Sequence, residues 1–178
     1  DNNNNRGITF PISIWDYPSN QFMVMVTDIG GWPGNVTYPT IAFLETSTAY
    51  TVTTVFDASL EENNIKLYID GELVNQHTWN HIVHENDANI IFGGFDESWN
   101  GLNGGADTRF FDGKLDNISV WNSPLSQEEI QNILDFEINS DEESLVGYWK
   151  FNAGIGDILY DHSGNGNHGT INGATWIE

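Results

Sequence analysis

The sequence predicts an all-β protein of short antiparallel strands with one helix, and three observations lead to this class. The 178 residues include 18 glycines and few runs that favour a helix. Short apolar segments alternate with clusters of Gly, Asn, Asp and Pro, the residues of turns. An Asp-Gly pair between two apolar runs marks a tight hairpin. We therefore expect a single domain over residues 1–178, with residues 1–6 as a loose polar segment.

Apolar residues that recur with a period of two, or that form a continuous run, mark the strands. Ile12 and Ile14 flank a serine in the first strand, and residues 22–26 are apolar throughout. Residues 15–20 combine aromatic, polar and proline residues and predict a loop between these two strands. Further strands are expected over residues 41–44, 50–56, 89–92, 115–121 and 147–151.

The clearest local pattern is a hairpin over residues 65–74. Ile65, Leu67 and Ile69 share one face of its first strand. Asp70 and Gly71 follow at the turn, where both residues must adopt positive φ angles. An apolar pair after the turn begins the return strand.

One helix is expected near residues 126–135. Pro124 precedes it, and Ser126 with Glu129 three residues later forms a capping box. In this arrangement each side chain bonds the backbone N–H of the other residue. The apolar stripe that would face the core consists of Ile130, Ile133 and Leu134.

The charge balance excludes several classes of partner. Five Lys+Arg against 26 Asp+Glu give a formal net charge of −21, which repels nucleic acid. Uronic-acid or sulfated polymers are repelled too, unless bound cations bridge them. The acids are scattered, so they indicate either solubility in a salty environment or calcium sites rather than an acidic tail. The chain has no cysteine, which excludes thiol catalysis, disulfides and zinc-thiolate sites. The apolar runs are too short for membrane insertion.

Three blocks in order resemble laminin-G-like and pentraxin-like modules of the concanavalin A-like lectin/glucanase superfamily, as found in bacterial surface or secreted proteins. Residues 64–71 read NIKLYIDG, and residues 111–121 read FDGKLDNISVW, followed by PLSQEEI at residues 124–130. The third block combines LVGYWKF, DHSGNGNHG and NGATW at residues 145–151, 161–169 and 172–176. The resemblance implies a two-sheet antiparallel jelly-roll sandwich with one short helix.

One departure from this pattern concerns the start of the module. Modules of this kind usually open with two further strands that carry an F-D-G signature followed by D-Y, and residues 1–60 of this chain have no such ordered signature. Either the chain starts inside the module, or residues 1–60 are a divergent version, or a neighbouring chain supplies the strands. A missing strand leaves open sheet edges, which invite pairing with a protein partner or neighbouring domain.

The resemblance implies a calcium site on the ligand side of the sandwich. Pentraxin-like modules carry acids just after the strand that matches residues 90–94, and a hard cation needs six to eight oxygen ligands. The alternative is a solvated acidic loop without metal. The residues in question are Asp96, Glu97 and Asp107, with Asp16 and Asn20 from an early loop.

A second calcium candidate is the loop that begins at Asp161. Asp161, Asn165 and Asn167 alternate with glycines, which would allow a tight loop to wrap an ion. The alternative is a glycine-rich turn in which Asp and Asn side chains bond their own backbone. The sequence leaves both interpretations open.

Sugar binding needs flat aromatic faces beside polar groups, and three aromatic residues lie in Gly-, Asn- and Pro-rich loops. These are Trp32, Tyr38 and Trp99. Trp99 is the leading candidate, with packing at the rim of the domain as the alternative. Its polar neighbours are Asp96, Glu97, Asn100 and Asn103.

Other chemistry is disfavoured. His77, His81 and His84 have spacings that would align on a helix and bind zinc, but β-rich surroundings predict exposed loop histidines instead. Retaining glycanases carry two carboxylates about 5 Å apart. The chain has no E-x-D-x-x-E alternation that would place them on one strand. Its five basic residues are too dispersed for a polysaccharide lyase.

These observations predict a non-catalytic, extracellular carbohydrate-binding or adhesion module that uses calcium. The expected partner is a glycan or cell-surface polysaccharide, and the expected location is outside the cell or on its surface. The main alternative is a structural or assembly segment of a multi-domain surface protein or filament. A glycan-cleaving enzyme is the least favoured.

Overall fold

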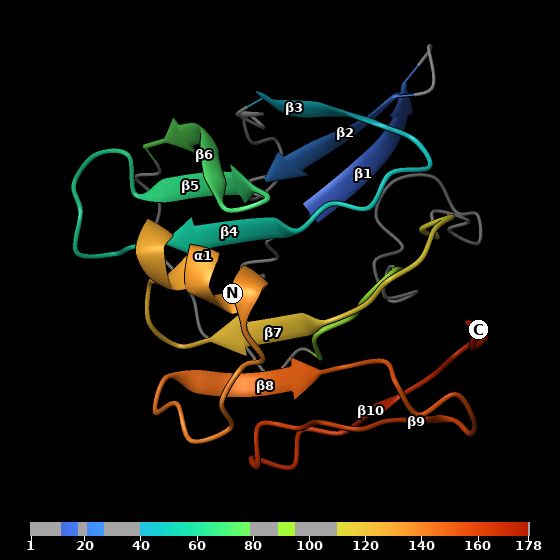
Figure 1. The fold of residues 1–178 in the computed structure, drawn as a ribbon. Helices are drawn as coiled ribbons and strands as arrows, with labels where there is room; N and C mark the ends of the chain where they lie inside the picture. Colours follow the sequence, from blue (N-terminus) through green and yellow to red (C-terminus); the bar gives the residue numbers. More distant parts are fainter. Residues whose placement is uncertain (1–11, 18–20, 27–39, 79–88, 95–109, 178) are drawn as a thin grey trace, which may run out of the picture. The chain divides into compact units, whose positions relative to one another are not determined.

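The computed structural model describes residues 12–17, 21–26, 40–78, 89–94 and 110–177, with side chains from Leu44 onward. The chain divides into two compact units that interleave along the sequence. The first combines Asp1–Ile90 with Pro124–Phe136, and the second combines Ile91–Ser123 with Glu137–Glu178. Figure 1 shows the elements in sequence colours.

The first sheet of unit 1 is a three-stranded antiparallel meander. Strands β1 (Ile12–Tyr17), β2 (Gln21–Val26) and β3 (Thr40–Glu45) pair in that order. The predicted loop over residues 15–20 is wrong for its first three residues, because these belong to β1 and pair with residues 21–23. Trp and Tyr favour extended backbone, and β2 supplies the partner that the sequence pattern did not reveal.

The second sheet of unit 1 contains the predicted hairpin. Strands β4 (Val52–Phe56), β5 (Ile65–Ile69) and β6 (Glu72–His77) are antiparallel, with β5 in the centre. Asp70 and Gly71 have φ angles of 49° and 78°, which confirms the tight turn. The Asp70 carboxylate also accepts a hydrogen bond from the Thr51 N–H at 2.8 Å, which ties the turn to the start of β4.

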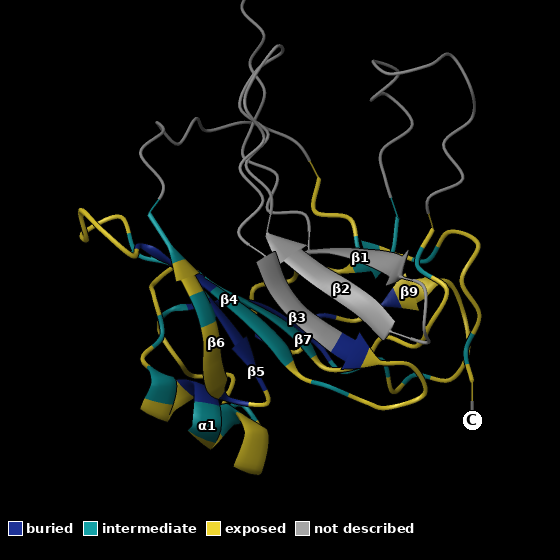
Figure 2. Ribbon diagram, turned by 90° about the horizontal axis from the view of Figure 1, so that it is seen from above, coloured by how far each residue is buried: buried dark blue, intermediate teal, exposed yellow. Residues whose placement is uncertain are grey.

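The core of unit 1 covers both faces of β5, which Figure 2 shows as buried. On one face Leu67 and Ile69 pack against Leu44 of β3. On the other face Tyr68 packs against Val55 and the helix residue Ile130. The predicted apolar face is confirmed, and β5 is in addition buried from the helix side.

Helix α1 (Gln127–Asp135) begins where the capping box predicted it. The Ser126 hydroxyl accepts from the Glu129 N–H, and the Glu129 carboxylate accepts from the Ser126 N–H at 2.7 Å. Ile130 is the buried residue of the expected apolar stripe. A Cβ added at Gly71 would lie 3.0 Å from side-chain atoms of Gln131 and Leu134, so this glycine permits the close approach of the helix to the turn.

Unit 2 is built on one long and one short antiparallel pair. Strand β7 (Ile118–Trp121) pairs with β8 (Leu145–Trp149), and β9 (Ile158–Leu159) pairs with β10 (Gly169–Thr170). The strand expected over residues 115–121 therefore begins three residues late. Asn117 has a φ of 49°, a left-handed conformation that ends strand geometry.

The strand expected over residues 89–92 is not formed. Ile90 and Ile91 are exposed, and among the described residues the adjacent Gly93 carbonyl accepts a hydrogen bond from the Phe111 N–H at 3.0 Å. A short apolar run becomes a strand only where a partner strand accepts and donates its backbone hydrogen bonds. The apolar pattern alone was an insufficient signal here.

Every strand pair in the described part of the chain is antiparallel, and α1 is the one helix found there. The predicted fold class is therefore confirmed. Across the same residues, no helix has both the length and the apolar character that crossing a membrane requires.

Candidate functional site

The loop after β9 is organised around the carboxylate of Asp161. This residue forms an isolated bridge with Trp149 at the end of β8, and it is buried. Its Oδ1 accepts hydrogen bonds from the N–H groups of Tyr148 (2.9 Å) and Ser163 (2.8 Å). Its Oδ2 accepts from the Ser163 hydroxyl (2.9 Å) and the Asn167 N–H (2.8 Å). One side chain thus connects β8 to both sides of the loop.

These hydrogen bonds determine the charge state of Asp161. Burial acts to raise its pKa, but the N–H groups of Tyr148, Ser163 and Asn167 and the Ser163 hydroxyl outweigh burial and lower the pKa to about 2. The carboxylate is therefore ionised at every pH at which the protein is expected to work. Its negative charge is balanced by protein dipoles, mostly from the backbone.

The two asparagines of the loop also bond β8, but as donors to its carbonyls. Asn165 Nδ2 donates to the carbonyls of Leu145 (2.8 Å) and Val146 (3.1 Å), and Asn167 Nδ2 also donates to Val146 at 2.8 Å. Gly164 has a φ of 87°, which allows the chain to turn between these residues. The loop is held against β8 by side-chain amides as well as by Asp161.

The structure brings Asp161, Asn165 and Asn167 together, as the sequence predicted, but the oxygens of Asp161 face protein donors. This arrangement is the backbone-capping turn that the sequence left open as the alternative. In the parts of the chain that are described, no three His, Asp or Glu side chains form a group that could hold a metal ion. Calcium at this loop stays a prediction, and an ion would have to displace existing hydrogen bonds.

The other predicted site residues lie elsewhere. Asp16 belongs to β1, where it pairs with Phe22, rather than to a loop. His77 ends β6 opposite Ile65, so it lies on a strand and not on a loop or a helix. Those that fall outside the described residues are Asn20, Trp32, Tyr38, His81, His84, Asp96, Glu97, Trp99, Asn100, Asn103 and Asp107.

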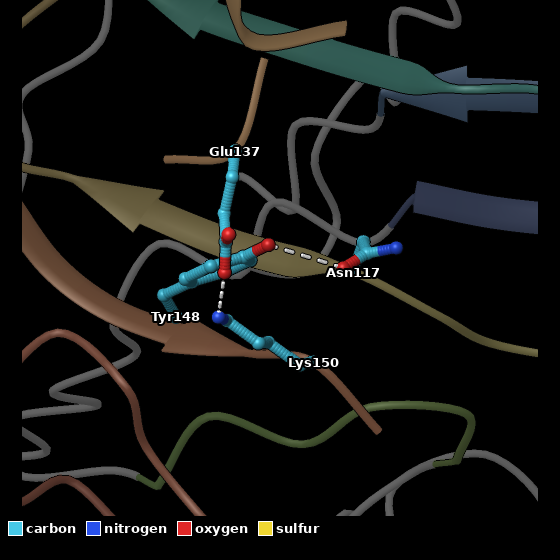
Figure 3. Close-up of polar contacts among 4 residues, drawn as sticks. All are labelled: Asn117, Glu137, Tyr148 and Lys150. Carbon is cyan, nitrogen blue, oxygen red and sulfur yellow. Dashed lines mark hydrogen bonds and ion pairs between the residues drawn. The ribbon is translucent and has the colours of Figure 1, made fainter. Parts of the chain in front are cut away.

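A second polar cluster, around Tyr148 of β8, was not predicted from the sequence. Figure 3 shows the Tyr148 hydroxyl donating to Asn117 Oδ1 (3.1 Å) and Lys150 paired with Glu137. The Lys150 ammonium lies 5.5 Å from the centroid of the Tyr148 ring. Burial raises the pKa of Tyr148, so its hydroxyl keeps the proton that it donates. Asn117 thus connects the start of β7 to β8.

A third feature, also missed, is the pair formed by Tyr160 and His168. The two rings meet edge to face with centroids 5.6 Å apart. His168 Nδ1 accepts a hydrogen bond from the Asp161 N–H at 3.0 Å. From the sequence, this histidine was identified only as part of a family motif. Tyr160, the aromatic residue just before Asp161, could have indicated a ring partner for it.

The lowered pKa of Asp161 predicts a specific loss of stability in acid. Its folded pKa of about 2 lies below the usual aspartate value of 3.8, so its contribution is fully present above about pH 4 and is lost as the pH falls toward 2. We expect this contribution to be about 2 kcal/mol. It is measured as the difference in free energy of unfolding in urea between the wild type and Asp161→Asn. A difference that stays constant from pH 6 to pH 2 would contradict the assignment.

Comparison with known proteins places the chain in a family. The family model Laminin_G_3, described as concanavalin A-like lectin/glucanases superfamily, matches residues 1–131. The loop around Asp161 therefore lies beyond the matched residues. No curated protein matches the chain.

One solved structure has the same fold. It is a crystal structure described as a "putative carbohydrate binding protein" from Bacteroides ovatus, which is 18% identical with a TM-score of 0.58. The match covers 90% of this chain and 45% of that one, so this chain spans less than half the length of that protein. With the match over residues 1–131, the antiparallel strands and the single described helix, the chain belongs to the concanavalin A-like lectin/glucanase superfamily.

Proposed function

We propose that this chain is a carbohydrate-binding module that binds its glycan without cleaving it. The superfamily includes both lectins and glucanases, so membership alone does not separate binding from hydrolysis. The Bacteroides ovatus structure with the same fold is described as a "putative carbohydrate binding protein", which supports binding.

Among the described residues, one observation supports binding over hydrolysis, which is the direction in which carboxyl pKa values are shifted. A glycosidase needs a general acid with a raised pKa. Here hydrogen bonds from Ser59 lower the pKa of Asp57, those from Ser126 lower that of Glu129, and Lys150 lowers that of Glu137. Asp161 is lowered to about 2. Each of these described carboxyls therefore has a lowered pKa and keeps its negative charge more strongly, as structural carboxylates do.

The finer part of the proposal concerns calcium and location. We propose that Asp96, Glu97 and Asp107 supply calcium ligands beside the sugar platform at Trp99. This assignment is supported by the acid-rich sequence and by the resemblance to pentraxin-like modules. The proposed location is extracellular, where free calcium is abundant, and the net charge of −21 favours neutral glycans.

The proposal is tested by calorimetry of the purified protein against neutral oligosaccharides, in calcium and in EDTA. We expect saturable binding, a large loss in EDTA, and the same loss for Asp96→Asn in the presence of calcium. Asp141→Asn, on the acidic segment after α1, is the matched control and should bind like the wild type. Release of reducing sugar ends during the assay would show hydrolysis and overturn the non-catalytic assignment. Binding with the same affinity in EDTA as in calcium would overturn the calcium assignment alone.

A further inference from the structure

The short ribbon of β9 and β10 has one covered face and one open face. Leu159 is 7% exposed, whereas its neighbours Ile158 and Tyr160 are 47% and 48% exposed. The register pairs Ile158 with Thr170 and Leu159 with Gly169, so the next position sets Tyr160 opposite His168. Side chains alternate along each strand, which places these four on the same open face: Ile158, Tyr160, His168 and Thr170.

His168 is exposed, yet its ring is fixed at two points. The Asp161 N–H donates to its Nδ1 at 3.0 Å, and the imidazole and Tyr160 rings meet edge to face. Because Nδ1 accepts, the neutral ring carries its proton on Nε2, which is a donor. Asp161 is itself held by four hydrogen bonds, so the support reaches back to β8. An exposed side chain that is already fixed loses little conformational entropy when a ligand binds, so the free-energy cost of binding is lower.

The chemistry of this open face matches a sugar ring. The electron-rich face of Tyr160 attracts the C–H side of a pyranose, and the Nε2–H of His168 and the hydroxyl of Thr170 can bond its hydroxyls. The face has a single nitrogen donor and belongs to a chain with a net charge of −21, so an anionic sugar would be repelled. The occupant that fits is a neutral glycan.

We infer that the Tyr160–His168 face of β9 and β10 is a glycan-contact surface for neutral sugars, built on the loop around Asp161. The inference rests on the proposed carbohydrate-binding function and names a site for it beyond the residues that the family model matches. Its residues differ from those proposed for the platform at Trp99, and none of them is among the proposed calcium ligands. The turn around Asp161 thereby gains a role, since it orients His168.

The test is titration of the ¹⁵N-labelled full chain with neutral oligosaccharides, followed by affinity measurements on variants. Binding should shift the amide signals of residues 158–160 and 168–170. Tyr160→Ala should weaken binding about tenfold or more, Tyr160→Trp should retain it, and His168→Ala should weaken it roughly fivefold. His162→Ala, an exposed histidine on the same loop, and Phe110→Ala, an exposed aromatic, are matched controls expected to bind like the wild type.

Each outcome decides one question. Binding that shifts other signals and is insensitive to Tyr160→Ala and His168→Ala overturns this surface and leaves the proposed function standing. Absence of binding to any neutral glycan by the folded wild type overturns both. Signals of residues 158–160 that shift with protein concentration instead of sugar would show a second copy on this face, and would also overturn the inference. Thermal unfolding of each variant confirms that the loop remains folded.

Discussion

Replacing Asp161 by alanine is expected to lower the free energy of unfolding by about 3 kcal/mol. The change removes an ionised acceptor from four hydrogen bonds and leaves the N–H groups of Tyr148, Ser163 and Asn167 without it. Hydrogen bonds to a charged group contribute roughly 1.5–3 kcal/mol each. Water that reaches the loop recovers part of the sum, since Asn167 is exposed. Urea unfolding at neutral pH measures the loss.

Two further variants show whether the loss comes from this acceptor. Asp157→Ala removes an exposed carboxylate from the segment just before β9 and is expected to change stability by less than about 0.5 kcal/mol. Asp161→Asn keeps the shape but turns an amide N–H toward backbone donors, so we expect a loss of about 2 kcal/mol. A loss below about 1 kcal/mol for both Asp161 variants would mean that the loop is held mainly by Asn165 and Asn167.

Local signals in the sequence predicted local structure well. The Asp70-Gly71 turn and the Ser126–Glu129 capping box were both confirmed, because the residues that determine each motif lie within four positions of one another. The Trp15 region and residues 89–92 were predicted less well. In both cases the outcome depends on whether a partner strand is present, and a period of two along one segment carries no such information.

The role of Asp161 was open for a related reason. Its sequence neighbours suit a metal loop and a capped turn equally, and the deciding contact is the N–H of Tyr148, 13 residues earlier. Which N–H it faces follows from the bridge between Trp149 and Asp161. His168 was missed because its Nδ1 partner is the backbone N–H of Asp161 rather than a side chain with a recognisable spacing.

The C-terminal segment is integral to unit 2 although the family model ends at residue 131. Strand β8 supplies the partner of β7, and Asn165 and Asn167 bond the carbonyls at the start of β8. The ladder between β7 and β8 therefore joins residues inside the matched segment to residues outside it. What the family match supports applies to β7. The surface on β9 and β10 lies outside the match, so it is supported by the contacts of that segment alone.

Ile130→Ala is expected to cost about 3 kcal/mol, comparable to the loss at Asp161. Ile130 is 2% exposed and packs against Val55 and Tyr68 on the helix side of β5. Truncation removes buried methyl groups and leaves a cavity that a central strand cannot easily close. The hydrogen bond from the Gln131 side chain to Glu72 at 3.1 Å lies on the exposed surface and cannot replace this packing. Urea unfolding gives the free energy.

Leu134→Ala is the matched control for Ile130, because it removes a similar volume one turn later in the same helix at a position that is 38% exposed. Its expected cost is about 1 kcal/mol, from the part of the side chain that contacts the hairpin turn. The two variants change helix propensity by similar small amounts, so the difference between them reports burial against β5. If Ile130→Ala costs no more than Leu134→Ala, α1 covers the sheet without being anchored to it. The core assigned to the second face of β5 would then be wrong.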